Sequence, residues 1–454
     1  MNVPRTSLSE LRQKFSEQAR KFFVLRQKFF LSPQKFLRLS LLGFLPALNA
    51  VAQAPDDYFA APEDTLPAEV APAPAALRPA ACVDADSLTA VLVCRLDSIV
   101  GDPVLERTQL GLFVYDLTED RPIYEFGHRQ TLRPASCQKI VTAVTALDRL
   151  GTDYSYRTSL LLEGTMEDSL LCGNIIVRAG YDPLFSAVDM QAFSRALRRE
   201  GVRAITGDVV LDISMKDTLR WGWGWCWDDG KLPLTPLLYE GGTHFRRRMA
   251  EVLADDSLSI LGVWRTGQST TDTREICVRQ RSIDAVLLTM MKESNNYYAE
   301  SMFYQLAARS RKPFATRREA VAEINALVRQ MGFDPADYQM ADGSGLSLYN
   351  YLSPELLVAF LRYAYQHPDI YRHLLPSLPE AGADGTLRKR LRGTAAAHNV
   401  RAKTGTVTGV SSLSGYCTAA DGHILAFAII NQGVRRAQVG KNIQDAVCRA
   451  LTEP

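Results

Sequence analysis

The chain has 454 residues, of which 46 % are hydrophobic and 22 % are charged, so it can bury one large core or two ordinary ones. This composition excludes a mainly disordered or collagen-like chain. Lys and Arg number 52 against 50 Asp and Glu, and nine of these bases but only two of the acids lie in residues 1–39. The other 43 bases and 48 acids leave the rest of the chain slightly acidic, which gives no electrostatic basis for binding nucleic acid.

The N-terminal residues have the pattern of an export signal. The cationic stretch is followed by the apolar run 39–48, which is too short to cross a bilayer, and then by the small-x-small cleavage pattern Ala52-Gln53-Ala54. We therefore expect a signal peptide over residues 1–54. Because the cationic part is long, an uncleaved anchor or an amphipathic surface helix stays open as an alternative, and membrane contact is expected only through this segment.

Residues 55–82 are rich in Ala and Pro and predict an extended linker. The rest alternates helix and strand patterns, which predicts an α+β fold with one domain formed by residues 83–155 and 233–454 and a small strand-rich insertion at 156–232. The expected strands are 110–116, 122–126, 175–178, 208–212, 413–418 and 424–430, and the expected helices are 140–150, 189–200, 245–261, 283–292, 297–308, 354–366 and 441–451.

The sequence lacks the motifs of several common metal-binding and catalytic sites. The eight cysteines form no C-x-x-C pair, the six histidines show no H-E-x-x-H spacing, and no G-x-S-x-G occurs, so we expect no metal and no cofactor. Export permits disulfides, and Cys82 with Cys94 is a plausible bridge, although small buried thiols explain the cysteines equally well. The tryptophans at 221, 223, 225 and 227 have period two, which predicts one face of an extended segment that packs the insertion or, less simply, stacks on sugars.

Ser136 and Lys139 form an S-x-x-K pattern at the start of a predicted buried helix. This spacing places the lysine one turn after the serine on the same helix face, within reach of its hydroxyl. Alone the pattern is weak, because serine is a favoured helix cap and a second copy stands at Ser32 to Lys35. Two later motifs, Ser294-Asn295-Asn296 between two predicted helices and Lys403-Thr404-Gly405 at a predicted strand, occur once each and in the local context that serine acylation chemistry requires.

With these three motifs the sequence resembles the active-site-serine penicillin-recognising enzymes, and in particular the low-molecular-mass class C penicillin-binding proteins, the D-alanyl-D-alanine carboxypeptidase/endopeptidases. The resemblance covers roughly residues 85–454 and extends to segments that begin at Gly207, Gly224, Asp342 and Asp384. It implies a transpeptidase/β-lactamase-like domain, an antiparallel sheet flanked by helices, in a periplasmic enzyme. The implied partners are peptidoglycan stem peptides as substrates and β-lactam antibiotics as inhibitors.

The resemblance assigns a role to each motif residue. Ser136 is the expected nucleophile and forms the acyl-enzyme, and Lys139 is its base, made neutral by partial burial and by the second cation, Lys403. Ser294 is expected to relay the proton to the leaving amine. The remaining expected roles are substrate binding by Asn296, Thr404, Gly405 and Thr406 and an oxyanion hole from the backbone N–H groups of Ser136 and Thr406.

Two other functions stay open at this level. A serine β-lactamase or esterase uses the same chemistry and differs in fast deacylation of the antibiotic. A catalytically silent wall-binding protein would keep the fold, although such a protein has no chemical need for the complete set of motifs.

Overall fold

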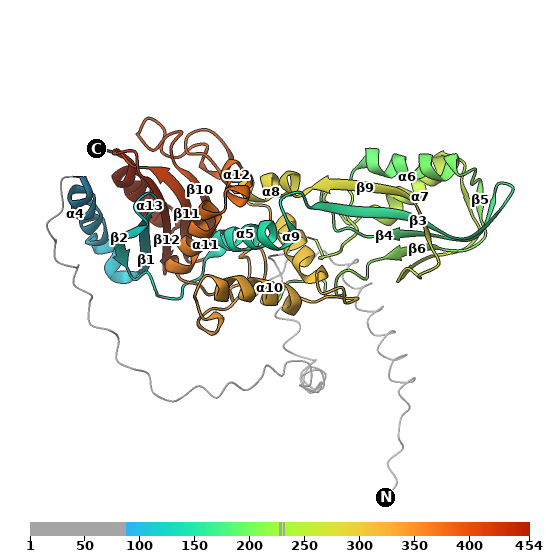
Figure 1. Ribbon diagram of the computed structural model, residues 1–454, viewed down its shortest axis with the longest axis horizontal. Helices are drawn as coiled ribbons and strands as arrows, with labels where there is room; N and C mark the ends of the chain where they lie inside the picture. The colour runs from blue at the N-terminus through green and yellow to red at the C-terminus, as the bar shows by residue number, and fades with distance from the viewer. Residues whose placement is uncertain (1–87, 227–228, 230–231) are drawn as a thin grey trace, which may run out of the picture. The chain divides into compact units, whose positions relative to one another are not determined.

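The computed structural model describes residues 88–226, 229 and 232–454. One sheet has five antiparallel strands in the order β10-β11-β12-β1-β2 (Figure 1). β1 pairs with β12 along its whole length, from Gln109 opposite Gln432 to Asp116 opposite Leu425, and so joins segments from both ends of the described chain. The strands are β1 (Gln109–Asp116), β2 (Arg121–Phe126), β10 (Arg401–Val407), β11 (Val410–Thr418) and β12 (Ile424–Gln432).

Helices cover both faces of this sheet, because its strands carry apolar side chains on both sides. Leu112 and Val114 of β1 pack with Leu96 and Val447 of the helices on one face, whereas Phe113 belongs to the core on the other. The first face is covered by α4 (Leu88–Val100) and α13 (Ala437–Thr452). The second core contains α5 (Gln138–Leu150), α8 (Ile283–Lys292), α9 (Asn296–Ala308), α10 (Arg317–Gln330), α11 (Pro354–Gln366) and α12 (Pro368–Ser377). The expected antiparallel sheet flanked by helices is confirmed.

A second sheet of seven strands has its own core and mixes antiparallel with parallel pairs (Figure 1). The helices α6 (Ala187–Arg199) and α7 (Phe245–Asp255) supply the crossovers that parallel neighbours require. Its strands are β3 (Ser155–Glu167), β4 (Leu170–Arg178), β5 (Ala204–Ile205), β6 (Val209–Asp212), β7 (Ser259–Ile260), β8 (Trp264–Gly267) and β9 (Arg274–Ser282).

The strand-rich segment extends further than the sequence indicates. Residue 232 is its predicted end, whereas β9 pairs with β3 as far as Ser282. The strand β9 is rich in charged, half-exposed side chains and therefore lacks the apolar alternation that predicts a strand. The helix expected over 245–261 is also too long: α7 ends at Asp255, Ser257 takes φ +58°, and the chain enters β7 at Ser259.

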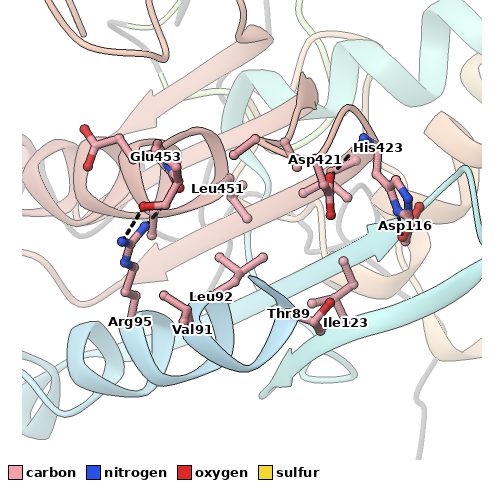
Figure 2. Close-up of a pocket in the computed structure, with 15 residues that line it drawn as sticks. Thr89, Val91, Leu92, Arg95, Asp116, Ile123, Asp421, His423, Leu451 and Glu453 are labelled. Carbon is pink, nitrogen blue, oxygen red and sulfur yellow. Dashed lines mark hydrogen bonds and ion pairs between the residues drawn. The ribbon is translucent and has the colours of Figure 1, made fainter. Parts of the chain in front are cut away.

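Hydrogen bonds join the two ends of the described chain beside the five-stranded sheet. A small cavity of about 30 Å³ lies between α4, β2 and the end of α13. Figure 2 shows the residues that line it. Arg95 donates hydrogen bonds of 2.9 and 2.6 Å to the backbone oxygens of Glu453 and Pro454, and the buried Asp116 pairs with His423 at 2.7 Å. Within the described ranges, no helix combines the length and the apolar character needed to cross a membrane. The expected signal peptide, the linker and Cys82 lie outside the described residues.

Candidate active site

The S-x-x-K motif forms where a short 3-10 turn enters a buried helix. Ser136 lies in η2 (Ala135–Cys137), and Lys139 lies in the first turn of α5. The Lys139 Nζ atom is 3.0 Å from the Ser136 Oγ atom, and the lysine has no exposed surface. The predicted contact between hydroxyl and amine is therefore present, away from bulk water.

Lys139 has three hydrogen-bonding partners, and their chemistry differs. The amine lies 2.8 Å from Asn296 Oδ1 and 2.7 Å from the backbone oxygen of Ser344, and both of these atoms can only accept. Only the third partner, the Ser136 hydroxyl, can also donate. A neutral amine has two N–H groups and one lone pair, so these partners satisfy it completely when the lone pair faces the serine.

The electrostatic setting favours this neutral form. Burial, followed by the charge of Lys403, lowers the pKa of Lys139 well below its ordinary value. Lys403 is also fully buried, and burial lowers its pKa to about 8. Its Nζ atom donates to Ser294 Oγ at 2.8 Å and to the backbone oxygen of Thr404 at 2.6 Å. The charge of Lys403 therefore acts on Lys139, although the two amines form hydrogen bonds with different motif residues.

The S-x-N motif occupies the break between α8 and α9. Asn295 caps α9, since its side chain accepts from the backbone N–H of Tyr297 at 3.0 Å. Ser294 has φ +58°, a left-handed conformation that is costly for serine and that places it on the Lys403 side of the site. Asn296, the first residue of α9, reaches Lys139 instead. The start of α9 thus supplies a hydrogen-bonding partner to each of the two lysines.

The K-T-G motif forms β10, the edge strand next to η2. Ala402 uses its N–H on the outer edge, where it donates to Pro379 O at 2.9 Å, so by alternation Thr404 and Thr406 present their N–H groups on that edge as well. Thr406 is exposed, and Thr404 Oγ1 donates to Thr386 Oγ1 at 2.8 Å. The edge therefore offers free backbone donors beside Ser136.

Gly405 lets this edge approach the nucleophile. A Cβ atom there would lie 2.1 Å from Ser412 Oγ, 2.8 Å from Pro134 O and 2.9 Å from Ser136 N. Two of these neighbours are backbone atoms, which cannot rotate away. Gly405 is buried, and because it has no side chain β10 can lie directly against the turn that contains Ser136.

Cys137, next to the nucleophile, is packed away from it as the helical geometry predicts. The thiol is fully buried and its Sγ atom donates to Lys403 O at 3.2 Å. Burial raises the pKa of this thiol, which keeps it in the unreactive protonated form.

The tryptophan segment differs from its prediction. Residues 221–226 form turns rather than an extended strand, because glycines alternate with the tryptophans and Gly224 takes φ +77°. Trp225 donates to the buried Asp342 at 2.8 Å, and Trp223 packs against Tyr349 with ring centroids 5.1 Å apart. The segment packs against the loop 342–350, and Trp227 lies outside the described residues.

Sequence reasoning missed two contributors to the site. The backbone oxygen of Ser344 contacts Lys139, and Glu300 on α9 accepts from the backbone N–H of that same serine. Glu300 could have been found, because it is an acid one turn after Asn296 on a helix of mostly apolar side chains. The resemblance includes the segment from Asp342 that contains Ser344, but the contact of the Ser344 carbonyl with Lys139 could not be predicted, since side-chain patterns do not reveal a backbone contact 205 residues away.

Comparison with known proteins gives a consistent result. Among curated proteins, the D-alanyl-D-alanine carboxypeptidase DacB of Haemophilus influenzae is 24 % identical over 71 % of this chain and 85 % of its own length. The D-alanyl-D-alanine carboxypeptidase of an Actinomadura species is 26 % identical over 79 % of this chain and 84 % of its own.

A solved structure shares the fold. The crystal structure of penicillin binding protein 4 from Haemophilus influenzae matches with a TM-score of 0.71 at 22 % identity, over 78 % of this chain and 98 % of that protein. A second structure of the same protein, complexed with a β-lactam, matches with a TM-score of 0.64 at 21 % identity, over the same shares. A family model for D-Ala-D-Ala carboxypeptidases matches residues 92–237 and 241–453, which is most of the sequence. The chain therefore belongs to the D-Ala-D-Ala carboxypeptidase 3 (S13) family.

Proposed function

We propose that this chain is a periplasmic serine D,D-peptidase that cleaves the bond between the terminal D-alanines of peptidoglycan stem peptides. One observation carries the proposal: the buried amine of Lys139 is held by two acceptor-only groups so that its third direction faces the Ser136 hydroxyl. Membership of the S13 family and the carboxypeptidase names of its relatives support the same reaction.

In the acylation step, the Ser136 oxygen attacks the carbonyl carbon of the penultimate D-alanine while its proton passes to Lys139 Nζ. The backbone N–H groups of Ser136 and Thr406 hold the negative oxygen of the tetrahedral intermediate. The C–N bond then breaks, and the leaving amine takes up the proton, with Ser294 as the relay. The products of this step are free D-alanine and an ester on Ser136.

In the deacylation step, water attacks the ester carbonyl and gives its proton to the same lysine. The C–O bond to Ser136 breaks, the serine recovers its proton from the lysine, and the shortened peptide leaves as a carboxylic acid. Its proton passes through water to the neutral amine of the released D-alanine, which leaves a carboxylate and an ammonium group. Atoms and protons balance over the two steps with water as the only co-substrate. No step requires a group that the motif residues do not supply.

Substrate binding follows from the charges and donors around the nucleophile. Lys403 supplies a cation, and Thr404 and Thr406 supply hydroxyl and backbone donors for the terminal carboxylate of the peptide. Asn296 uses its oxygen on Lys139 and keeps its N–H₂ group for the substrate's peptide carbonyl. β-Lactams present a similar carbonyl, and the penicillin binding protein 4 structure with a bound β-lactam supports their binding here.

The test measures D-alanine release from a peptide that ends in D-Ala-D-Ala, with the Ser136→Ala variant as the control. We expect release by the wild-type chain and none above background for the variant. A cross-linked peptide dimer in the same assay separates endopeptidase from carboxypeptidase activity. If neither substrate is cut but a β-lactam is turned over, the chain is a β-lactamase; if nothing is cut or acylated, the wall-binding alternative holds.

A further inference from the structure

Glu300 is a buried acid at the centre of the site that none of the three motifs contains. It lies on α9 one turn after Asn296, so both side chains project from the same face of the helix. Only 1 % of its surface is exposed, and within the described chain it forms no ion pair. A buried carboxyl group is costly unless hydrogen bonds compensate for lost water.

The hydrogen bonds of Glu300 lead to the proposed base in two steps. Its Oε1 atom accepts from the backbone N–H of Gly343 at 3.1 Å and of Ser344 at 2.9 Å. The carbonyl oxygen of Ser344 then accepts from Lys139 Nζ at 2.7 Å. The Ser344 N–H and the Ser344 carbonyl belong to adjacent peptide units that meet at the Ser344 Cα atom, so Glu300 holds one side of this joint. Asp342 holds the other side, because it accepts from the Gly345 N–H, which lies in the same peptide plane as the Ser344 carbonyl.

The loop has a second buried acid, and the two acids hold different things. Asp342 accepts from Gly345, Ser347 and Asn350 of its own loop at 2.7 to 2.8 Å, and from Trp225 at 2.8 Å, but from no residue of α9. Glu300 instead joins the loop to α9, the helix that also carries Asn296. At this junction a Cβ atom on Gly343 would lie 2.5 Å from Phe303 Cβ, which shows how closely the loop packs on the helix.

We infer that Glu300 is a positioning residue of Lys139: by holding the N–H groups of Gly343 and Ser344 it anchors to α9 the loop segment whose Ser344 carbonyl takes one N–H of the amine and leaves the lone pair for Ser136. This inference rests on the proposed function, since it assigns the geometry of the base in that reaction. Glu300 itself touches no reacting atom, and Asn296 takes the second N–H.

The charge state of Glu300 suits this role. Burial and the nearby Asp342 raise its pKa to about 8, so it is protonated at neutral pH and glutamine is a close mimic. When Glu300 ionises above this pH, its negative charge favours the protonated form of Lys139 and thereby opposes the base. The titratable side chains that face Glu300 are Lys139, Asp342, Tyr181, Tyr304 and Lys216.

The test measures the second-order rate constant for acylation by benzylpenicillin from pH 6 to 9.5 in the full chain. Glu300→Ala frees both loop amides and is expected to slow acylation at pH 7 about 100-fold, the typical cost of misplacing a catalytic group by about 1 Å. Glu300→Gln keeps a carbonyl acceptor and should stay within about threefold of the wild type at pH 7. Above pH 8 it should become faster than the wild type, because it cannot ionise.

Glu319→Ala is the matched control, since Glu319 also accepts a backbone N–H, from Thr316 at 2.9 Å, but at the start of α10. Acylation of Glu300→Ala at the control's rate, or of Glu300→Gln as slowly as Glu300→Ala, would overturn the inference. If Glu300→Ala does not fold, the pH profile decides, and a constant ratio of Glu300→Gln to wild type from pH 6 to 9.5 overturns it. Failure of the wild type itself to form a Ser136 adduct refutes the proposed function instead.

Discussion

The two sheets of this chain differ in how their buried charged groups are partnered. In the seven-stranded sheet, Arg279 and Arg281 of β9 pair with the buried Asp189 at 2.6 and 3.0 Å. At the edge of the five-stranded sheet, Lys139 and Lys403 are fully buried, and in the described part of the chain neither forms an ion pair with a carboxylate. Paired charges fix a structure, whereas buried charges without a counter-ion become easier to deprotonate, and this is the property that a base needs.

The largest effect is expected for Lys139→Met, which keeps the length of the side chain and removes the amine. Without a base, the Ser136 hydroxyl keeps its proton, so acylation by benzylpenicillin should fall about 10³- to 10⁴-fold. Stopped-flow or gel-based acylation rates measure this, with thermal unfolding to show that the variant folds. Acylation within about tenfold of the wild type would mean that another group acts as the base.

The second prediction concerns pH and the pairing of the two lysines. Lys403 is charged below a pKa of about 8, and its charge helps to keep Lys139 neutral. Acylation should therefore decline as the pH rises through about 8, because the cation that binds the substrate is lost. In Lys403→Met this alkaline decline should shrink to the part that ionisation of Glu300 causes, the acid limb should move to higher pH, and the rate at pH 7 should fall about 100-fold. Profiles of identical shape in both proteins would contradict this role.

Gly405→Ala tests whether β10 must lack a side chain at this position in order to lie beside Ser136. The new methyl group would lie 2.9 Å from Ser136 N, so we expect about 1–3 kcal/mol of destabilisation and about tenfold slower acylation. Gly242→Ala in the region of the second sheet is the control, since its Cβ atom would meet nothing closer than 3.4 Å. Denaturant unfolding and acylation rates measure both, and equal behaviour of the two variants would refute the special role of Gly405.

The smallest effect on activity is expected for Asp189→Ala, which removes the acid that pairs with the arginines of β9 in the seven-stranded sheet. It removes the acid that caps α6 through Ser186 N at 2.9 Å and leaves Arg279 without this carboxylate, whereas Arg281 keeps Asp182 at 3.4 Å. We expect a loss of about 2 kcal/mol in unfolding free energy, measured in denaturant, with acylation within about twofold of the wild type. A large loss of activity at full stability would show that this region serves the reaction.

The sequence predicts the contacts of the site that lie within one helical turn. Ser136 and Lys139 are three residues apart on one helix, so helical geometry alone brings them together. The contact between Ser294 and Lys403, 109 residues apart, was not predicted, because no periodicity joins two such distant motifs.

What the sequence did not predict depends on tertiary structure. β9 is a charged edge strand without an apolar pattern, and the tryptophan segment turns at glycines that its period-two spacing does not reveal. Glu300 acts through backbone amides of a distant loop, and such contacts depend on packing that no local pattern specifies.

Intact-protein mass spectrometry with benzylpenicillin, followed by peptide mapping, shows whether Ser136 forms the acyl-enzyme. We expect one adduct of the antibiotic's mass on the peptide that contains Ser136, and no adduct in Ser136→Ala. An adduct that persists in Ser136→Ala, or that maps to another residue such as Cys137, would mean that Ser136 is not the nucleophile.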